Sequence, residues 1–254
     1  MEKKDINKEE SLILIEANIA NDMMLDGLTG LRKANNFEIE KYYKSFFLLS
    51  IGIERLLKLI LIYEYKKKND GKLPSNKILK DSGHNIKKMI KTSCPNLLDK
   101  YIYNIVIEFI TDFAKNTRYY NLDILTGKEL EADPISVWNI IEGIILKTYN
   151  AKIPVIQNNQ ILKNMIKEFT DMHITLSDGT TTDNIEPLLF EIETKDIIQG
   201  YNVLVFYEII QSLVEILVDY QGNNTYPDMR EIFRIFLASY TKSEIRNKKN
   251  WKKI

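Results

Sequence analysis

Cysteine and histidine are scarce in this sequence, with one cysteine, Cys94, and two histidines among 254 residues. A lone cysteine cannot form a disulfide within the chain, and it has no second cysteine with which to build a zinc knuckle. We therefore expect a reducing compartment and predict a cytoplasmic protein. The sequence also lacks a Walker-type glycine loop, a Gly-x-Ser-x-Gly elbow and a His-Glu-x-x-His metal helix. We expect no metal and no other cofactor.

Long apolar runs are missing as well. The most apolar uncharged stretches, residues 45–53 and 197–207, end at charged residues well short of the ~20 residues that a membrane span needs. The chain starts with mixed charges instead of the apolar stretch of a signal peptide. We therefore expect no transmembrane segment and no export signal.

The sequence has no excess of charge of either sign, because 35 basic residues balance 35 acidic ones. With 44% hydrophobic and 28% charged residues, this is the composition of a folded globular protein. A protein that binds nucleic acid over its whole surface is usually distinctly basic, so any such binding here requires a local patch.

Apolar residues recur at steps of three and four through most of the chain, which predicts helices. The clearest stripe contains Phe46, Leu49, Ile53, Leu56, Ile60 and Tyr63. A helix is predicted at residues 9–33, through Leu12, Ile15, Ile19, Met23 and Leu28. Asp133 suits an N-cap and Pro134 the first helical position, which predicts a helix at 133–149. Further helices are predicted from 85 to about 91, from Pro95 to about 118, at 195–220 and after Pro227. The turn signal Ser177-Asp178-Gly179 predicts a small β-hairpin or loop insertion within residues 172–193. The predicted fold class is an all-α multi-helix bundle.

We divide the chain into four parts by these patterns. They are an N-terminal helix that packs on the bundle (1–36), a helical bundle (37–150), a C-terminal helical part (151–241) and a basic tail (242–254). Because the tail carries five basic residues against one acid, its composition predicts partial disorder.

Glu54 and Lys58 lie four residues apart on the predicted long helix, on a face shared with apolar residues. The simplest interpretation is an i,i+4 ion pair worth ~0.2–0.5 kcal/mol. The shared face predicts that the pair is only partly exposed. It should face the start of the helix that follows His84, or the segment around Arg118.

Gly83, His84 and Asn85 precede a predicted helix start, where free backbone N–H groups and the helix dipole favour an anion. The alternative is that the histidine only caps a tight turn. Of the two histidines, His84 is the better candidate for function, because His173 has no polar neighbours in sequence.

Another helix ends in a polar, basic and aromatic cluster between residues 115 and 123. Its cations Lys115 and Arg118 suit phosphate oxygens, and its tyrosines Tyr119 and Tyr120 suit base stacking. The alternative is structural: Arg118 binds the last carbonyls of the helix and both tyrosines lie in the core.

The long helix, the Gly83-His84 helix start and the Arg118 segment together resemble the HEPN superfamily of helical bundles, over residues 37–150. Active members carry an arginine followed after four to six residues by a histidine. The resemblance implies metal-independent RNA cleavage across a homodimer interface, in a bacterial defence, toxin–antitoxin or stress context. Arg118 matches that arginine, but the position five residues on is Asp123.

This replacement changes the expected chemistry, because an ordinary aspartate is ionised and can only accept a proton, whereas histidine can also donate one. An Arg118–Asp123 ion pair would be structural. His84 can replace the missing imidazole only if folding brings it close.

The sequence thus predicts an RNA- or nucleotide-binding protein that forms a homodimer, and the resemblance implies ribonuclease activity. Its predicted catalytic residues are Arg118, Asp123 and His84, and its predicted binding residues are Lys115, Asn116, Tyr119, Asn121, Glu54 and Lys58. One alternative is a catalytically inactive helical module for dimerisation or for binding an unknown protein partner. Another is a metal-dependent enzyme that uses acids such as Glu54, Glu108 and Asp112.

Overall fold

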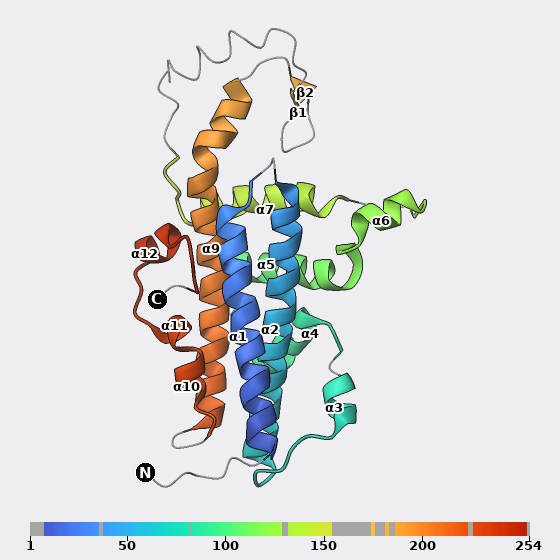
Figure 1. Cartoon of the computed structure of the whole chain (residues 1–254), viewed down its shortest axis with the longest axis vertical. Coiled ribbons are helices and arrows are strands. Elements are labelled where there is room, and N and C mark those ends of the chain that lie inside the picture. Colours follow the sequence, from blue (N-terminus) through green and yellow to red (C-terminus); the bar gives the residue numbers. More distant parts are fainter. Residues whose placement is uncertain are drawn as a thin grey trace.

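Three long helices run side by side along the molecule in the computed structural model (Figure 1). They are α1 (Lys8–Lys33), α2 (Ile39–Lys68) and α9 (Glu186–Gln221). The structure describes residues 8–35, 38–81, 83–128, 132–153, 174–175, 181–182, 186–222 and 226–252. Their architecture confirms the predicted all-α multi-helix bundle.

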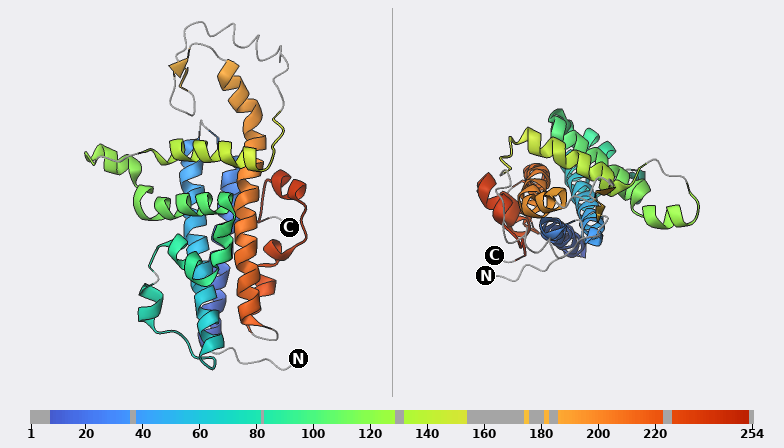
Figure 2. Two further views of the ribbon diagram at one scale, coloured as in Figure 1. Left: turned by 180° about the vertical axis from the view of Figure 1, so that it is seen from behind. Right: turned by 90° about the horizontal axis from the view of Figure 1, so that it is seen from above.

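Shorter helices pack across α2 and α9, on the side away from α1 (Figure 2). This second layer contains α4 (Ile86–Ser93), the 3-10 helix η1 (Pro95–Asp99), α5 (Tyr101–Asp112), the π-helical turn η2 (Phe113–Thr117) and α7 (Pro134–Thr148). The short helices α3 (Asn76–Asp81) and α6 (Tyr120–Leu125) lie on the outside, and α6 projects away from the bundle. The last helices, α10 (Met229–Ile232), α11 (Arg234–Leu237) and α12 (Lys242–Asn247), lie along α9.

Several local predictions from the sequence are confirmed. The Asp133 side chain caps α7 by accepting a hydrogen bond from the backbone N–H of Ser136, with Pro134 in the first helical position. The small hairpin is present as two antiparallel strands of two residues each, β1 (Ile174–Thr175) and β2 (Thr181–Thr182). The helix expected after Pro227 is instead split into α10 and α11.

The apolar residues that predict α1 are only partly buried. Leu12 and Ile15 are 57% and 53% exposed, whereas Leu28 is fully buried. The buried side of α1 also carries Ala17, Ala20 and Met24. Small side chains give little apolar signal in a sequence, yet they permit the closest approach of a neighbouring helix.

The basic segment packs on the bundle over residues 242–252, the part of it that the structure describes, although its composition predicts partial disorder. Trp251 is fully buried, and its ring centroid lies 5.1 Å from that of Tyr207 on α9. The backbone N–H of Trp251 also donates a hydrogen bond to Thr29 Oγ1 on α1. One buried aromatic side chain therefore holds a segment that composition alone marked as a tail.

One stretch of α9, Thr194–Gln221, has the length and apolar composition of a membrane span, the only such helix in the described residues. However, 67% of its most apolar 18-residue window is buried within the protein. The central helix of a bundle passes the same test, so this is weak evidence for a membrane location.

A buried polar cluster joins α2, α7 and α9. The Glu142 carboxylate, only 8% exposed, receives hydrogen bonds from Tyr42, Trp138, Lys195 and Asn202. Burying a carboxylate is costly unless it is paired and hydrogen-bonded, and here four donors meet it. This cluster fixes the position of α7 against the long helices.

Helices α1 and α2 approach closely at glycines. A Cβ atom on Gly52 would lie 2.6 Å from Met24 Cγ and 3.1 Å from the Met24 backbone nitrogen. A Cβ on Gly27 would lie 2.7 Å from Leu49 Cγ. The crossing therefore requires residues without side chains at both points.

We predict that Gly52→Ala destabilises the fold by ~1–3 kcal/mol, because overpacking forces the helices apart. Gly143→Ala is the matched control, since nothing lies within 4 Å of the Cβ that it adds to α7. That control should stabilise the protein by ~0.5–1 kcal/mol through helix propensity. Urea unfolding of both variants measures these changes, and equal effects would contradict the close crossing.

Candidate functional site

A pocket of about 510 Å³ lies where α2, the segment before α4 and the π-helical turn meet. Four predicted site residues line it together: Glu54, His84, Lys115 and Arg118. They come from three separate parts of the chain, so only the folded protein brings them together. The possibility that folding places His84 near Arg118 is therefore realised.

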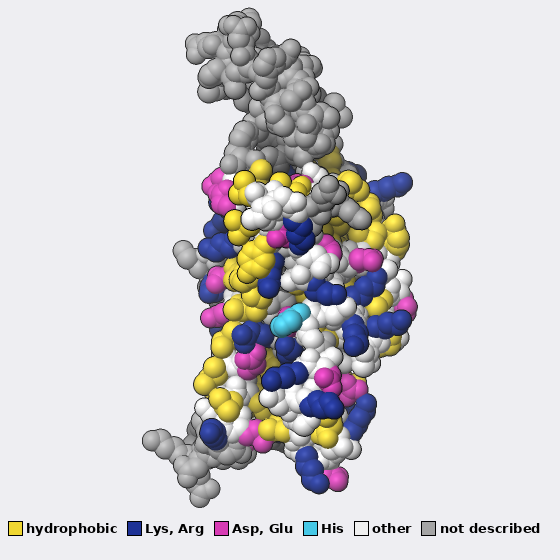
Figure 3. Space-filling view, turned by 90° about the vertical axis from the view of Figure 1, so that its right-hand side faces the viewer, with side chains coloured by type: hydrophobic (Ala, Val, Ile, Leu, Met, Phe, Trp, Pro, Cys, Tyr) yellow, Lys and Arg dark blue, Asp and Glu magenta, His cyan; other side chains and the backbone are white. Residues whose placement is uncertain are grey.

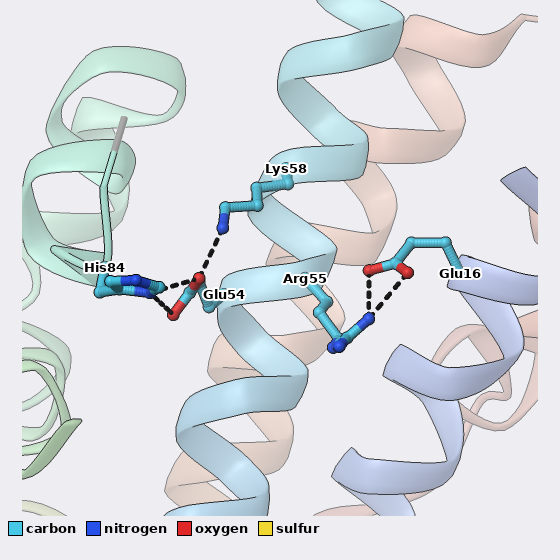
Figure 4. Close-up of polar contacts among 5 residues, drawn as sticks. All are labelled: Glu16, Glu54, Arg55, Lys58 and His84. Carbon is cyan, nitrogen blue, oxygen red and sulfur yellow. Dashed lines mark hydrogen bonds and ion pairs between the residues drawn. The ribbon is translucent and has the colours of Figure 1, made fainter. Parts of the chain in front are cut away.

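The imidazole of His84 lies against the carboxylate of Glu54, as Figure 4 shows. His84 Nδ1 is 3.0 Å from Glu54 Oε1 and 3.1 Å from Oε2. Lys58 Nζ donates to Oε1 of the same carboxylate at 2.6 Å. The Glu54 side chain is 13% exposed and that of Lys58 29%, whereas that of His84 is 77% exposed. As predicted, the Glu54–Lys58 pair is partly buried and faces the segment before α4.

The next residue on α2 points toward another helix. Arg55 donates to Glu16 on α1, with its Nη1 atom 2.6 and 2.7 Å from the two carboxylate oxygens (Figure 4). Successive helical residues are about 100° apart around the axis. Because Arg55 holds α2 against α1, Glu54 is directed toward the pocket.

Arg118 follows the π-helical turn, where its backbone N–H donates to the carbonyl of Phe113. A π-helical turn is a local departure from the α-helix that is frequent at functional sites. Arg118 is exposed, and its guanidinium lies 5.0 Å from the ring centre of Tyr119, itself 55% exposed. The structural alternative, which placed both tyrosines in the core, is therefore wrong for Tyr119.

Basic side chains gather on this face of the molecule around a histidine (Figure 3). Three of them, Lys88, Lys115 and Arg118, line the pocket. Within the described part of the chain none of the three has an ion-pair partner. The acids Glu54 and Asp81 also line it, so the described lining has three permanent cations against two carboxylates. The charged side chains of the described lining therefore leave an excess of one positive charge.

Five predicted site residues do not line this pocket: Lys58, Asn116, Tyr119, Asn121 and Asp123. Asp123 pairs with Lys128 at 2.8 Å, so the Arg118–Asp123 ion pair considered from the sequence is absent. Asn116 donates to Asp112 at 2.6 Å, and Asn121 is exposed on the projecting helix α6. The chain turns away after Arg118, which carries the following residues out of the site.

The start of α4 does not present a row of free N–H groups, contrary to the anion-binding interpretation of residues 83–85. The backbone N–H of Lys87 donates to Thr111 Oγ1, and that of Lys88 donates to Asn85 Oδ1. Asn85 is therefore the N-cap of α4. Any anion here would have to be bound by side chains.

A larger pocket of about 590 Å³ lies between η1 and α9 and includes Cys94. Burial raises the pKa of the Cys94 thiol to about 12, so this group is not a nucleophile near neutral pH. We therefore take the pocket with His84 and Arg118 as the candidate site.

The predicted metal alternative gains no geometric support. Among the residues that the structure describes, no three His, Cys, Asp or Glu side chains are arranged to hold a metal ion. Glu108 instead pairs with Lys87 at 3.0 Å, and Asp112 accepts from Asn116.

Comparison of the chain with protein-family models, curated proteins and solved structures found no match in any of the three. The function therefore has to be argued from the pocket itself.

We predict that Arg118→Ala changes the free energy of unfolding by less than about 0.5 kcal/mol, because Arg118 is exposed and has no ion pair among the described residues. Arg32→Ala is the matched control, since the buried Arg32 donates to Asp196 and to the carbonyl of Arg246. The control should cost ~1.5–3 kcal/mol. Thermal melts compare the two, and a large loss for Arg118→Ala would favour a structural role.

Proposed function

We propose that this is a cytoplasmic, HEPN-like protein that binds RNA or a nucleotide in the pocket between α2, α4 and the π-helical turn. The observation that carries the proposal is the meeting of the His84 imidazole with Arg118, Lys88 and Lys115 in one pocket. A guanidinium presents planar donors that suit phosphate oxygens, and lysines add point charges. The resemblance to HEPN proteins favours a role in bacterial defence or in a toxin–antitoxin pair.

Tyr119 supports RNA as the ligand. Its exposed ring lies beside the guanidinium of Arg118, which is one of the three cations that line the pocket. Unpaired bases stack on aromatic side chains, and such stacking contributes ~1–3 kcal/mol per base. A strand whose phosphate is bound by Arg118 can place a neighbouring base on this ring.

His84 supports metal-independent cleavage as the activity of the pocket. An imidazole can serve as both proton acceptor and proton donor in catalysis, and the ring of His84 is exposed at the pocket. In RNA the 2′-oxygen attacks the adjacent phosphorus and the bond to the 5′-oxygen breaks. One proton moves from the 2′-oxygen to the 5′-oxygen through the imidazole, and the cations stabilise the charge on phosphate. His84 would thus take the role of the histidine in the HEPN motif, whose position is occupied by Asp123 in this chain.

We predict that Arg118→Ala weakens RNA binding by ~1.5–3 kcal/mol, the usual range for a lost charge-assisted hydrogen bond, or roughly 10- to 150-fold in Kd. The control is Arg234→Ala, since Arg234 is exposed on α11 and does not line the pocket. Fluorescence anisotropy with a labelled single-stranded RNA measures both. Equal affinities for the two variants would refute phosphate binding at this pocket.

Cleavage should persist with a chelator present and fall by about 10²-fold or more in His84→Ala, the range for loss of a general acid or base. The second histidine gives the matched control, His173→Ala. Activity that disappears with the chelator would instead favour a metal-dependent enzyme.

A catalytically inactive interaction module is the second candidate function, and the projecting helix α6 favours it. None of the six residues of α6 is buried, and Leu122, Ile124 and Leu125 are 60%, 44% and 81% exposed. This apolar surface adjoins Arg118 in sequence, so we propose that it contributes to a homodimer. Light scattering should give twice the mass of the 29.7 kDa chain. Leu125→Asp should shift that mass toward one chain, and a monomeric wild-type protein would contradict the dimer.

A further inference from the structure

The contact between Glu54 and His84 determines which imidazole nitrogen is available to a ligand. A carboxylate can only accept hydrogen bonds, so the ring nitrogen beside it must carry a proton. That nitrogen is Nδ1, at 3.0 and 3.1 Å from the two Glu54 oxygens. In the neutral ring the other nitrogen, Nε2, then holds the free lone pair. No hydrogen bond within the described part of the chain occupies Nε2.

Glu54 in turn is held by Lys58, which lies one helical turn further along α2. The Lys58 ammonium donates to Oε1 at 2.6 Å and compensates the charge of a carboxylate that is only 13% exposed. Both groups come from the rigid middle of a long helix, whereas His84 lies on the segment between two short helices (Figure 4). Glu54 and Lys58 on α2 therefore hold the imidazole of His84, whose own segment belongs to no helix.

From this geometry we infer that Glu54 and Lys58 are positioning residues, and that they keep His84 in the tautomer with a proton on Nδ1 and Nε2 free for proton transfer. This assignment rests on the proposed cleavage site and replaces the RNA-binding role that the sequence predicted for the two residues. Glu54 cannot bind phosphate directly, because two like charges would repel. Its effect on a substrate passes through the imidazole.

The tautomer can be measured without any RNA. Only two histidines are present, so the variant His173→Asn leaves His84 as the single imidazole in the ¹⁵N spectrum. A series of spectra at rising pH identifies the form of the ring that no longer changes, and in that neutral form the two nitrogens report where the proton is. We expect the shift of a protonated nitrogen at Nδ1 and of an unprotonated nitrogen at Nε2. Glu54→Gln should move both shifts toward a mixture of tautomers, because an amide can donate as well as accept.

A closely matched control lies on the same helix. Glu64 and Lys68 form an i,i+4 pair at 2.7 Å, and the Glu64 side chain is 18% exposed, but no histidine contact to Glu64 occurs in the described residues. Glu64→Gln removes the same charge from the same kind of pair. It should leave the ¹⁵N shifts of His84 unchanged.

In the cleavage assay Glu54→Gln should lower kcat by roughly tenfold or more, as expected when a carboxylate no longer holds an imidazole in one tautomer, with KM within about twofold. Lys58→Met should act in the same direction more weakly, and Glu64→Gln should have no effect. A KM that rises while kcat is unchanged would show direct RNA binding by Glu54 and overturn the assignment.

The two readouts separate this inference from the proposed function. If the ¹⁵N shifts behave as expected but no RNA is cleaved, the proposed function fails and the positioning of His84 stands. If RNA is cleaved but Glu54→Gln leaves the His84 shifts unchanged, the inference fails and the proposed function stands. A melting curve of Glu54→Gln close to that of Glu64→Gln establishes that the variant is folded.

Discussion

The close crossing of α1 and α2 is the constraint on which the rest of the structure depends. Gly52 and Gly27 allow the two backbones to approach to a distance that any side chain at these points would prevent. The Arg55–Glu16 contact fixes the rotation of α2 about its own axis at the same crossing. With one side of α2 committed to α1, the adjacent side carries Glu54 and Lys58 toward the segment before α4. The candidate site is thus positioned by packing that lies outside it.

The residues of the site come from elements that are buried to different extents. Glu54 is rigid because it belongs to the middle of a 30-residue helix, whereas His84 joins α3, which buries none of its residues, to α4. The π-helical turn ends α5 so that Arg118 points toward the pocket instead of continuing along the helix. Unpaired cations and an imidazole held by a carboxylate are features that a purely structural surface does not require. The proposed binding of a phosphate-containing ligand rests on these features.

The proposed HEPN-like function rests on Arg118 at this helix end, and the other groups of the candidate site come from elsewhere in the chain. Asp123 stands at the position of the motif histidine and forms an ion pair with Lys128. The imidazole in the pocket is that of His84, 39 residues before Asp123 in the chain, and it contacts Glu54 on α2. The proposed cleavage therefore depends on groups that come from separate elements of the fold.

The sequence by itself determined the helical class, most helix positions and the Asp133 cap, because three-to-four spacing and capping residues act over one or two turns. It also singled out Glu54, His84, Lys115 and Arg118, since charged and imidazole side chains are visible one by one, but it did not single out Lys88. Only the tertiary structure decided which of them meet. The buried face of α1, the packing of Trp251 and the exclusion of Asp123 from the pocket depend on contacts between residues far apart in the chain. Local spacing has no information about such contacts, and the Glu54–His84 pairing exists only because the crossing of α1 and α2 orients one turn of α2.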